Sequence, residues 1–208
     1  MKLTHYLAAA ALASFIFAGC GGPDEKTKDN AGTISPAGKE TTDTKEKQEN
    51  GIDLEQKGDY TRLYSITDEC KLSAAELAEA MGFSADKVTE GDNHGKGYCT
   101  YIVSYPDGST NRISISVNDF PLERVRYEIK TNLSSNPSLL SISTSGDTYI
   151  YKHLNQGFLQ LYNPDHSNLV RVSYGGLANF KGLNDDQKKE RSENAYKIVD
   201  YLIKKYQD

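Results

Sequence analysis

From Gly21 to Gly58 the chain has no aromatic residue, and six lysines and nine acidic residues stand among Thr, Gly, Asn and Gln. Such a segment cannot bury enough apolar surface to offset the entropy that it would lose on ordering. We expect a disordered tether with an end-to-end distance of roughly 35 Å; a charged, exposed helix over residues 39–50 is the alternative. A hydrophobic core must then form within residues 59–208, a length that suits one globular domain.

The residues before the tether have the pattern of an export signal. Lys2 is the only charged residue among the first 19, and a short apolar segment ends in Ala18 and Gly19, just before Cys20. A basic start, a short apolar core and small residues at a cleavage point are typical of secretory signal peptides. The segment is also shorter than the ~20 apolar residues of a membrane-spanning helix.

The sequence F-A-G-C at residues 17–20 resembles the bacterial lipoprotein box, although Phe17 stands where that family more often has leucine. The resemblance implies that residues 1–19 are cut off as a signal peptide and that Cys20 carries acyl chains, such as palmitate, that hold the protein on a membrane. Residues 20–58 would be the lipidated cysteine and its tether. Gly21 follows Cys20 in place of aspartate, which favours the outer over the inner membrane of the bacterial cell envelope. The alternative is a secreted protein with a free Cys20.

The net charge excludes some partners. It is -5 for the whole chain, and removal of Lys2 with the signal peptide makes it -6. Nucleic-acid phosphates require clustered Lys and Arg, so we expect no nucleic-acid partner and no basic patch that docks on anionic lipid.

Two cysteines remain after Cys20, namely Cys70 and Cys99. Two cysteines in an exported domain favour a disulfide. A catalytic thiol is the alternative, since His94 lies five residues before Cys99. A reactive thiol needs such a neighbour to lower its pKa, but His94 lies in a glycine-rich loop that would hold the geometry poorly.

The domain has the pattern of an α+β fold. Ser73 and Glu76 form a capping box, Leu72 and Leu77 a hydrophobic staple, and Gly82 supplies the C-terminal residue, so a helix is predicted over residues 74–81. Period-two alternation on both sides of Pro-Asp-Gly predicts a hairpin. The further expected elements are a strand or irregular segment at 60–66, strands at 97–105 and around 113–117, a helix at 121–133, a loop at 134–147, strands at 148–154, 157–163 and 168–175, and a last helix through 195–206 capped by Asn184 or Ser192.

This order predicts a mainly antiparallel sheet that three helices cover on one or both faces. Asp-Glu-Cys-Lys-Leu-Ser at 68–73, Gly-Tyr-Cys-Thr-Tyr at 97–101 and Ser-Gly-Asp-Thr-Tyr at 145–149 resemble a Cys…Cys-x-Tyr…Gly-Asp pattern of small bacterial envelope lipoproteins. These include actinobacterial lipoprotein families of unknown function, and some of their domains are similar to the α/β/α sandwich of PsbP-type proteins and to the extracellular sensor domain of a mycobacterial serine/threonine kinase. The resemblance implies a Cys70–Cys99 disulfide and no known catalysis.

Motifs for catalysis, cofactors and metals are weak. The stretch Gly91–Gly97 resembles a phosphate-binding loop, but it is one residue short, and Gly97 stands where a Ser or Thr is needed. His94, His153 and His166 are scattered, so we expect no metal site and no cofactor. Asp185 and Asp186 suit a helix N-terminus.

Tyrosine is the remaining feature, with 14 residues and no tryptophan. Tyr149, Tyr151, Tyr162 and Arg171 fall on neighbouring strands. Packing between sheet and helices is the expected role of the rings, and a binding patch is the alternative. We expect a non-catalytic binding or interaction module that recognises an unknown protein or small molecule. The alternatives are an envelope hydrolase whose residues converge only in the fold and a purely structural envelope role.

Overall fold

The computed structural model describes residues 58–153, 155–175 and 180–207. The predicted signal peptide, Cys20 and most of the tether lie outside the described residues. None of the helices in these ranges is long and apolar enough to cross a membrane.

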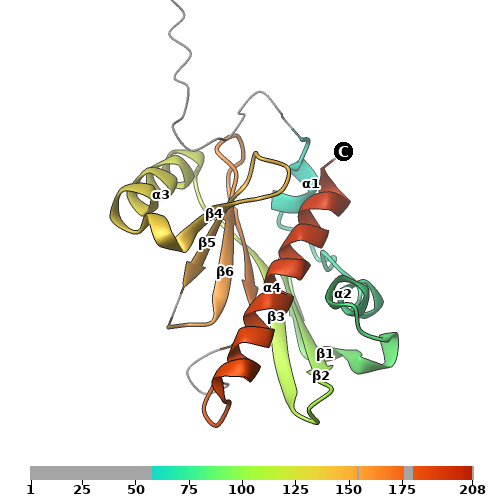
Figure 1. Ribbon diagram of the computed structural model, residues 1–208. Coiled ribbons are helices and arrows are strands. Elements are labelled where there is room, and N and C mark those ends of the chain that lie inside the picture. Colours follow the sequence, from blue (N-terminus) through green and yellow to red (C-terminus); the bar gives the residue numbers. More distant parts are fainter. Residues whose placement is uncertain (1–57, 154, 176–179, 208) are drawn as a thin grey trace, which may run out of the picture. The chain divides into compact units, whose positions relative to one another are not determined.

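Seven antiparallel strands form one open sheet in the order β1-β2-β3-β7-β6-β5-β4 (Figure 1). Neighbouring strands in the middle of the sheet pair over four to seven residues. The hairpin predicted around Pro-Asp-Gly is confirmed, because it joins β2 to β3. The strands are β1 (Val88–Gly95), β2 (Tyr98–Ser104), β3 (Thr110–Asn118), β4 (Leu140–Ile142), β5 (Tyr149–His153), β6 (Phe158–Tyr162) and β7 (Leu169–Ser173).

Helices lie on both faces of this sheet. Figure 1 shows α3 on one side of the strands and α2 and α4 on the other. The larger apolar cluster joins α1, α2 and α4 to the sheet through residues such as Leu77, Ile113 and Ile198. A smaller cluster joins Val125 and Ile129 of α3 to the opposite face. The helices are α1 (Thr61–Tyr64), α2 (Ala74–Met81), α3 (Leu122–Ser135) and α4 (Asp185–Tyr206), with short 3-10 turns at Ala85–Lys87 and Pro137–Leu139.

Both helix starts predicted from polar caps are confirmed. The Ser73 side chain accepts a hydrogen bond from the backbone of Glu76, whose carboxylate accepts one in return from the backbone of Ser73. Asn184, one of two expected caps for the last helix, does the same with Gln187. Asp185 and Asp186 occupy the first turn of α4, where the helix dipole favours carboxylates.

The fold differs from the sequence prediction at three places. β1 includes most of the segment read as a glycine-rich loop, and β4 lies within the segment 134–147 read as a loop. These two strands are the edges of the sheet. Val88 is the only buried residue of β1 and β4 has none, so neither carries the alternation that marks a half-buried strand. The segment near residue 60 forms the short helix α1, which makes four α-helices rather than three.

Candidate functional site: the open half of the sheet face under α3

The predicted tyrosine patch is divided by α3. Tyr149 and Tyr162 are 1% and 3% exposed, and they pack against Val125 and Ile129 beneath that helix. Burial raises the pKa of the Tyr162 hydroxyl well above its usual range. Tyr151 is half-buried at the margin of the same cluster. Two of the four candidate patch residues are therefore core residues, which is the packing role that the sequence favoured for the tyrosines.

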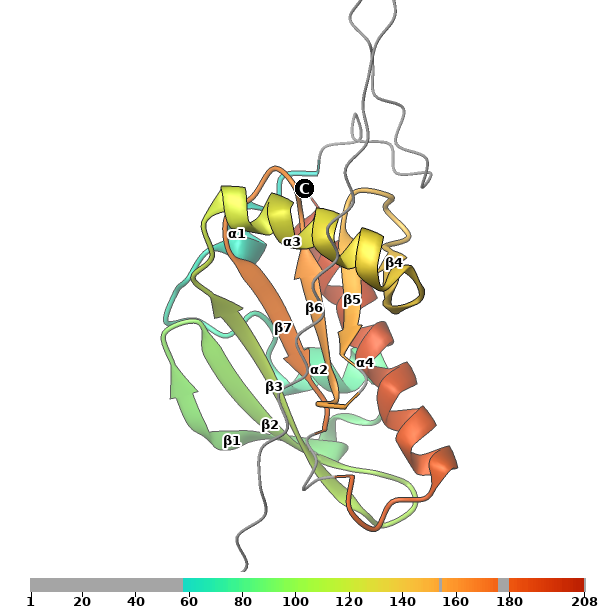
Figure 2. The ribbon, with the colours of Figure 1, turned by 90° about the vertical axis from the view of Figure 1, so that its left-hand side faces the viewer.

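α3 crosses only one end of this sheet face (Figure 2). Beyond it, the strand register places Tyr151 beside Gln160, Gln160 beside Arg171, and Arg171 beside Ser116. A second row lies further from α3. It contains His153, Phe158, Ser173 and Ser114. No helix among the described residues lies over these two rows, and we call them the sheet-face patch.

Arg171 is the central charge of this patch. Its guanidinium carbon lies 4.5 Å from the centroid of the Phe158 ring, a cation–π geometry. Its Nε is buried and has no hydrogen-bond partner within the described part of the chain. The ring of His153 packs against the same phenyl ring at 4.7 Å between centroids, and its Nδ1 is likewise buried without a partner.

The neighbouring groups are neutral and polar. The hydroxyl of Tyr162 donates to Oε1 of Gln160 at 3.0 Å, which leaves the amide NH2 of Gln160 as the remaining donor of that side chain. Ser114, Ser116 and Ser173 add small hydroxyls on the β3–β7 side. The patch therefore presents a stacked cation among hydrogen-bond donors, an arrangement that suits a planar anion such as a carboxylate.

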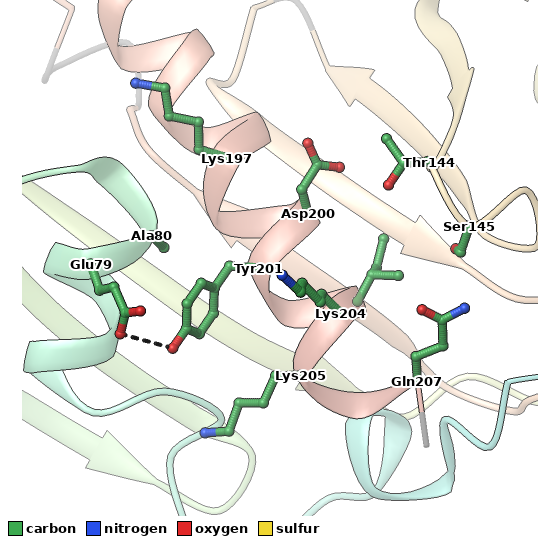
Figure 3. A pocket seen from close by; sticks show the side chains of 11 residues that line it. Glu79, Ala80, Thr144, Ser145, Lys197, Asp200, Tyr201, Lys204, Lys205 and Gln207 are labelled. Carbon is green, nitrogen blue, oxygen red and sulfur yellow. Dashed lines mark hydrogen bonds between the residues drawn. The ribbon is translucent and has the colours of Figure 1, made fainter.

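A groove of about 1210 Å³ lies between α2, α4 and the Ser143–Thr148 loop (Figure 3). Two of its lining side chains have charged partners. The Tyr201 hydroxyl donates to Glu79 at 3.2 Å, and the Lys205 ammonium lies 2.7 Å from Glu76. Lys197, Asp200 and Lys204 also line the groove, so it carries charges of both signs, whereas the sheet-face patch has one central cation.

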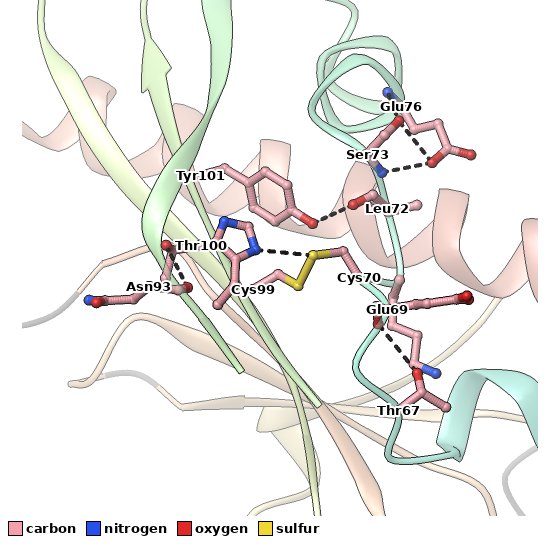
Figure 4. Close-up of a disulfide and its surroundings, with 12 residues drawn as sticks. Thr67, Glu69, Cys70, Leu72, Ser73, Glu76, Asn93, Cys99, Thr100 and Tyr101 are labelled. Atoms are coloured by element: carbon pink, nitrogen blue, oxygen red, sulfur yellow. Dashed lines mark hydrogen bonds between the residues drawn. A yellow bond between two sulfur atoms is a disulfide. The ribbon is translucent and has the colours of Figure 1, made fainter. Parts of the chain in front are cut away.

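The predicted disulfide joins Cys70 to Cys99 (Figure 4). It links the segment before α2 to β2. Nδ1 of His94 lies 3.3 Å from Sγ of Cys70. The sequence did not predict this proximity, because His94 was placed in a loop, whereas it pairs with Cys99 across the β1–β2 ladder. Both sulfurs are engaged in the disulfide, so neither is a free thiol in this structure.

Asp147 of the Gly-Asp motif anchors the start of the domain. It is 4% exposed and accepts hydrogen bonds from the Tyr60 hydroxyl at 2.9 and 3.0 Å and from Ser145 Oγ at 2.6 Å. The ring of His166 stacks on Tyr64 at 5.3 Å between centroids. The bond from Tyr60, which precedes α1, ties the start of that helix to the loop before β5. In this group of Ser, Asp and His, the serine donates directly to the carboxylate. A hydrolase would need an imidazole as the acceptor of that proton.

Gly97 explains why the end of the Gly91–Gly97 stretch forms the turn between β1 and β2 rather than a phosphate loop. Its φ is +70°, and its N–H donates to the carbonyl of Thr67 at 2.6 Å. Its own carbonyl accepts from Val117 N at 2.7 Å. The backbone groups of this glycine are thus used within the protein.

Comparisons with protein families, with curated proteins and with solved structures gave no significant match. The resemblance to envelope lipoproteins and PsbP-type domains therefore stays a prediction.

Proposed function

We propose that this protein is a non-catalytic binding module of the bacterial cell envelope, held on a membrane by lipid at Cys20, and that it binds a carboxylate-bearing ligand on the sheet-face patch. The observation that carries the proposal is the buried, unpartnered Nε of Arg171 on the part of the sheet face that no described helix covers. A buried donor without a partner costs about 1–3 kcal/mol. A ligand oxygen would remove that cost.

The chemistry of the neighbours narrows the ligand class. An arginine held flat on an aromatic ring is pre-organised to receive a carboxylate, because little side-chain entropy remains to be lost. Phe158 holds Arg171 in this way. The half-buried ring of Tyr151 and the small serines of β3 and β7 offer apolar and hydroxyl contacts to an extended ligand. Peptidoglycan fragments combine carboxylates, sugars and short peptides in the compartment expected for this protein, and they are the first probe.

The test uses the mature chain with Cys20→Ser, which removes the lipid, and with the disulfide intact. Melting temperatures are measured with soluble peptidoglycan fragments and, for comparison, with neutral sugars, lipids, nucleotides and metal salts. A ligand that binds only the folded state raises the melting temperature. We expect a saturable rise with the carboxylate-bearing fragments and none with neutral sugars.

Two arginine variants locate the site. Arg171→Gln is expected to abolish the shift. Arg112→Gln is the matched control, because Arg112 lies on the same sheet face, two residues before Ser114, and is exposed. It removes the same charge outside the patch and is expected to leave the shift unchanged. No shift with any carboxylate-bearing fragment, or an equal loss in both variants, would contradict the proposal.

A further inference from the structure

Of the residues that the structure describes, one group of side chains has the composition of a metal site. The ligand atoms of Cys70, His94 and Cys99 all lie within 4.8 Å of one another. Cys99 is 2% exposed, Cys70 is half-buried and His94 is exposed, so the group opens to solvent on its histidine side.

Contacts other than the disulfide hold these residues together. His94 pairs with Cys99 in the β1–β2 ladder, just after a register break that begins at Glu90. The segment around Cys70 is fixed from both sides. Before it, the carbonyl of Thr67 accepts from Gly97 N at 2.6 Å. After it, the carbonyl of Leu72 accepts from the Tyr101 hydroxyl at 2.5 Å.

The carbonyl of Lys71 is held as well. It accepts from the Tyr206 hydroxyl at 3.0 Å and from the Lys205 ammonium at 3.1 Å. Because these bonds bracket Cys70 in the chain, the two sulfurs stay close to each other and to His94 when the bond between them is opened.

We propose that the reduced form of this protein binds a thiophilic divalent cation of the zinc class through Cys70, Cys99 and His94. Zinc bonds to sulfur at about 2.3 Å and to nitrogen at about 2.0–2.1 Å, so a tetrahedral site places S and N about 3.5 Å apart and the two sulfurs about 3.8 Å apart. His94 Nδ1 already lies 3.3 Å from Cys70 Sγ. The two sulfurs must move apart and the Cys99 sulfur must take its place near the imidazole, and rotation about the side-chain bonds allows both movements, since all the ligand atoms lie within 4.8 Å.

The Cys70–Cys99 disulfide must first be reduced. A dithiol, such as the active-site pair of a thiol–disulfide oxidoreductase, can be the reductant. The dithiol gives two electrons and two protons to the Cys70–Cys99 disulfide and becomes a disulfide itself. Binding of Zn²⁺ then releases the two thiol protons, because thiolates are the ligands. Three protein ligands leave a fourth position for water on the exposed side. His94 and Cys99 lie on β1 and β2, and Cys70 lies before α2. None of these segments contributes a residue to the sheet-face patch, so the zinc site does not rest on the proposed function.

The test uses the mature Cys20→Ser chain, reduced with a phosphine and freed of oxygen. Co²⁺ is titrated as the spectroscopic probe, and Zn²⁺ is then added to displace it. We expect one Co²⁺ per chain with a thiolate-to-cobalt charge-transfer band, and we expect the oxidised protein to show no such band. His94→Gln is expected to weaken binding at least tenfold. The matched control, His166→Gln, changes a histidine between β6 and β7 that is not part of this group, and it is expected to bind as the parent does.

Near-ultraviolet circular dichroism of the tyrosines reports whether the reduced chain stays folded. If reduction unfolds it, Zn²⁺ is expected to restore the folded signal in the parent but not in His94→Gln, since the metal would replace the lost cross-link. Absence of the charge-transfer band in the reduced, folded protein overturns the inference. The same holds if Zn²⁺ fails to restore an unfolded one, or if His94→Gln binds as tightly as the parent.

Discussion

Opening the Cys70–Cys99 disulfide is expected to destabilise the domain by about 3.6 kcal/mol. The two cysteines are 29 residues apart. A cross-link over such a loop lowers the entropy of the unfolded chain by about 12 cal/mol/K, which at 25 °C gives this free energy. Typical domains are stable by about 5–15 kcal/mol, so the reduced protein should remain folded at room temperature. The hydrogen bonds that bracket Cys70 favour the same outcome.

The assay is urea unfolding of the Cys20→Ser chain with and without a phosphine reductant, followed by circular dichroism. With a slope near 2 kcal/mol/M, the midpoint is expected to fall by roughly 2 M, and the melting temperature by roughly 7–14 °C. Reduction removes no side-chain atoms and so isolates the cross-link. The Cys70→Ala, Cys99→Ala double variant adds a packing loss of about 1 kcal/mol at the buried Cys99. A loss of unfolding free energy under about 1 kcal/mol on reduction would refute the reasoning. It would mean that the unfolded chain is restricted nearly as much without the disulfide as with it.

Three further outcomes are expected. Tyr60→Phe should cost about 1.5–3 kcal/mol of unfolding free energy, because the buried carboxylate of Asp147 loses a donor; Tyr98→Phe, on an exposed ring, should change it by less than about 0.5 kcal/mol in the same urea assay. Burial and the nearby carboxylate raise the pKa of Tyr60 from its usual value near 10 to about 12. The contribution of Tyr60 to the unfolding free energy is therefore complete below pH 10 and is lost as the pH rises toward 12. A melting temperature that stays constant over that range would contradict this expectation. Gly82→Ala should lower the unfolding free energy by about 1–2 kcal/mol, because φ is +76° and an alanine there strains the backbone. Gly95→Ala should leave the unfolding free energy unchanged, because the added Cβ meets equally open space there and φ is not positive.

Several features of the fold could be read from short stretches of sequence. The capping box at Ser73, the left-handed Gly82 and the Pro-Asp-Gly hairpin each depend on residues a few positions apart, and all three are present. The cap at Asn184 was one of two alternatives. The Cys70–Cys99 pairing followed from the predicted export of the domain and the predicted lipidation of Cys20, since these leave two cysteines and one possible pairing.

Other features were decided by the tertiary structure. The edge strands β1 and β4 carry no alternating pattern, because an edge strand with one solvated side buries few residues, and pairing with β2 and β5 is what makes them strands. Tyr149 and Tyr162 belong to the core rather than to a surface because α3 packs on them, and a residue's own strand does not show which part of a sheet face a distant helix will cover.

The candidate sites likewise depend partly on the sequence and partly on the tertiary structure. Arg171 was a candidate residue of the alternative binding patch, but its stacking on Phe158 and the unpartnered Nε depend on cross-strand register. His94 joined the two cysteines only through the β1–β2 register. The sequence by itself determined the caps, the turn and the cysteine pair, because these depend on local backbone geometry and on counting. The tertiary structure decided which side chains meet and which face remains open, because those depend on contacts between segments far apart in the chain.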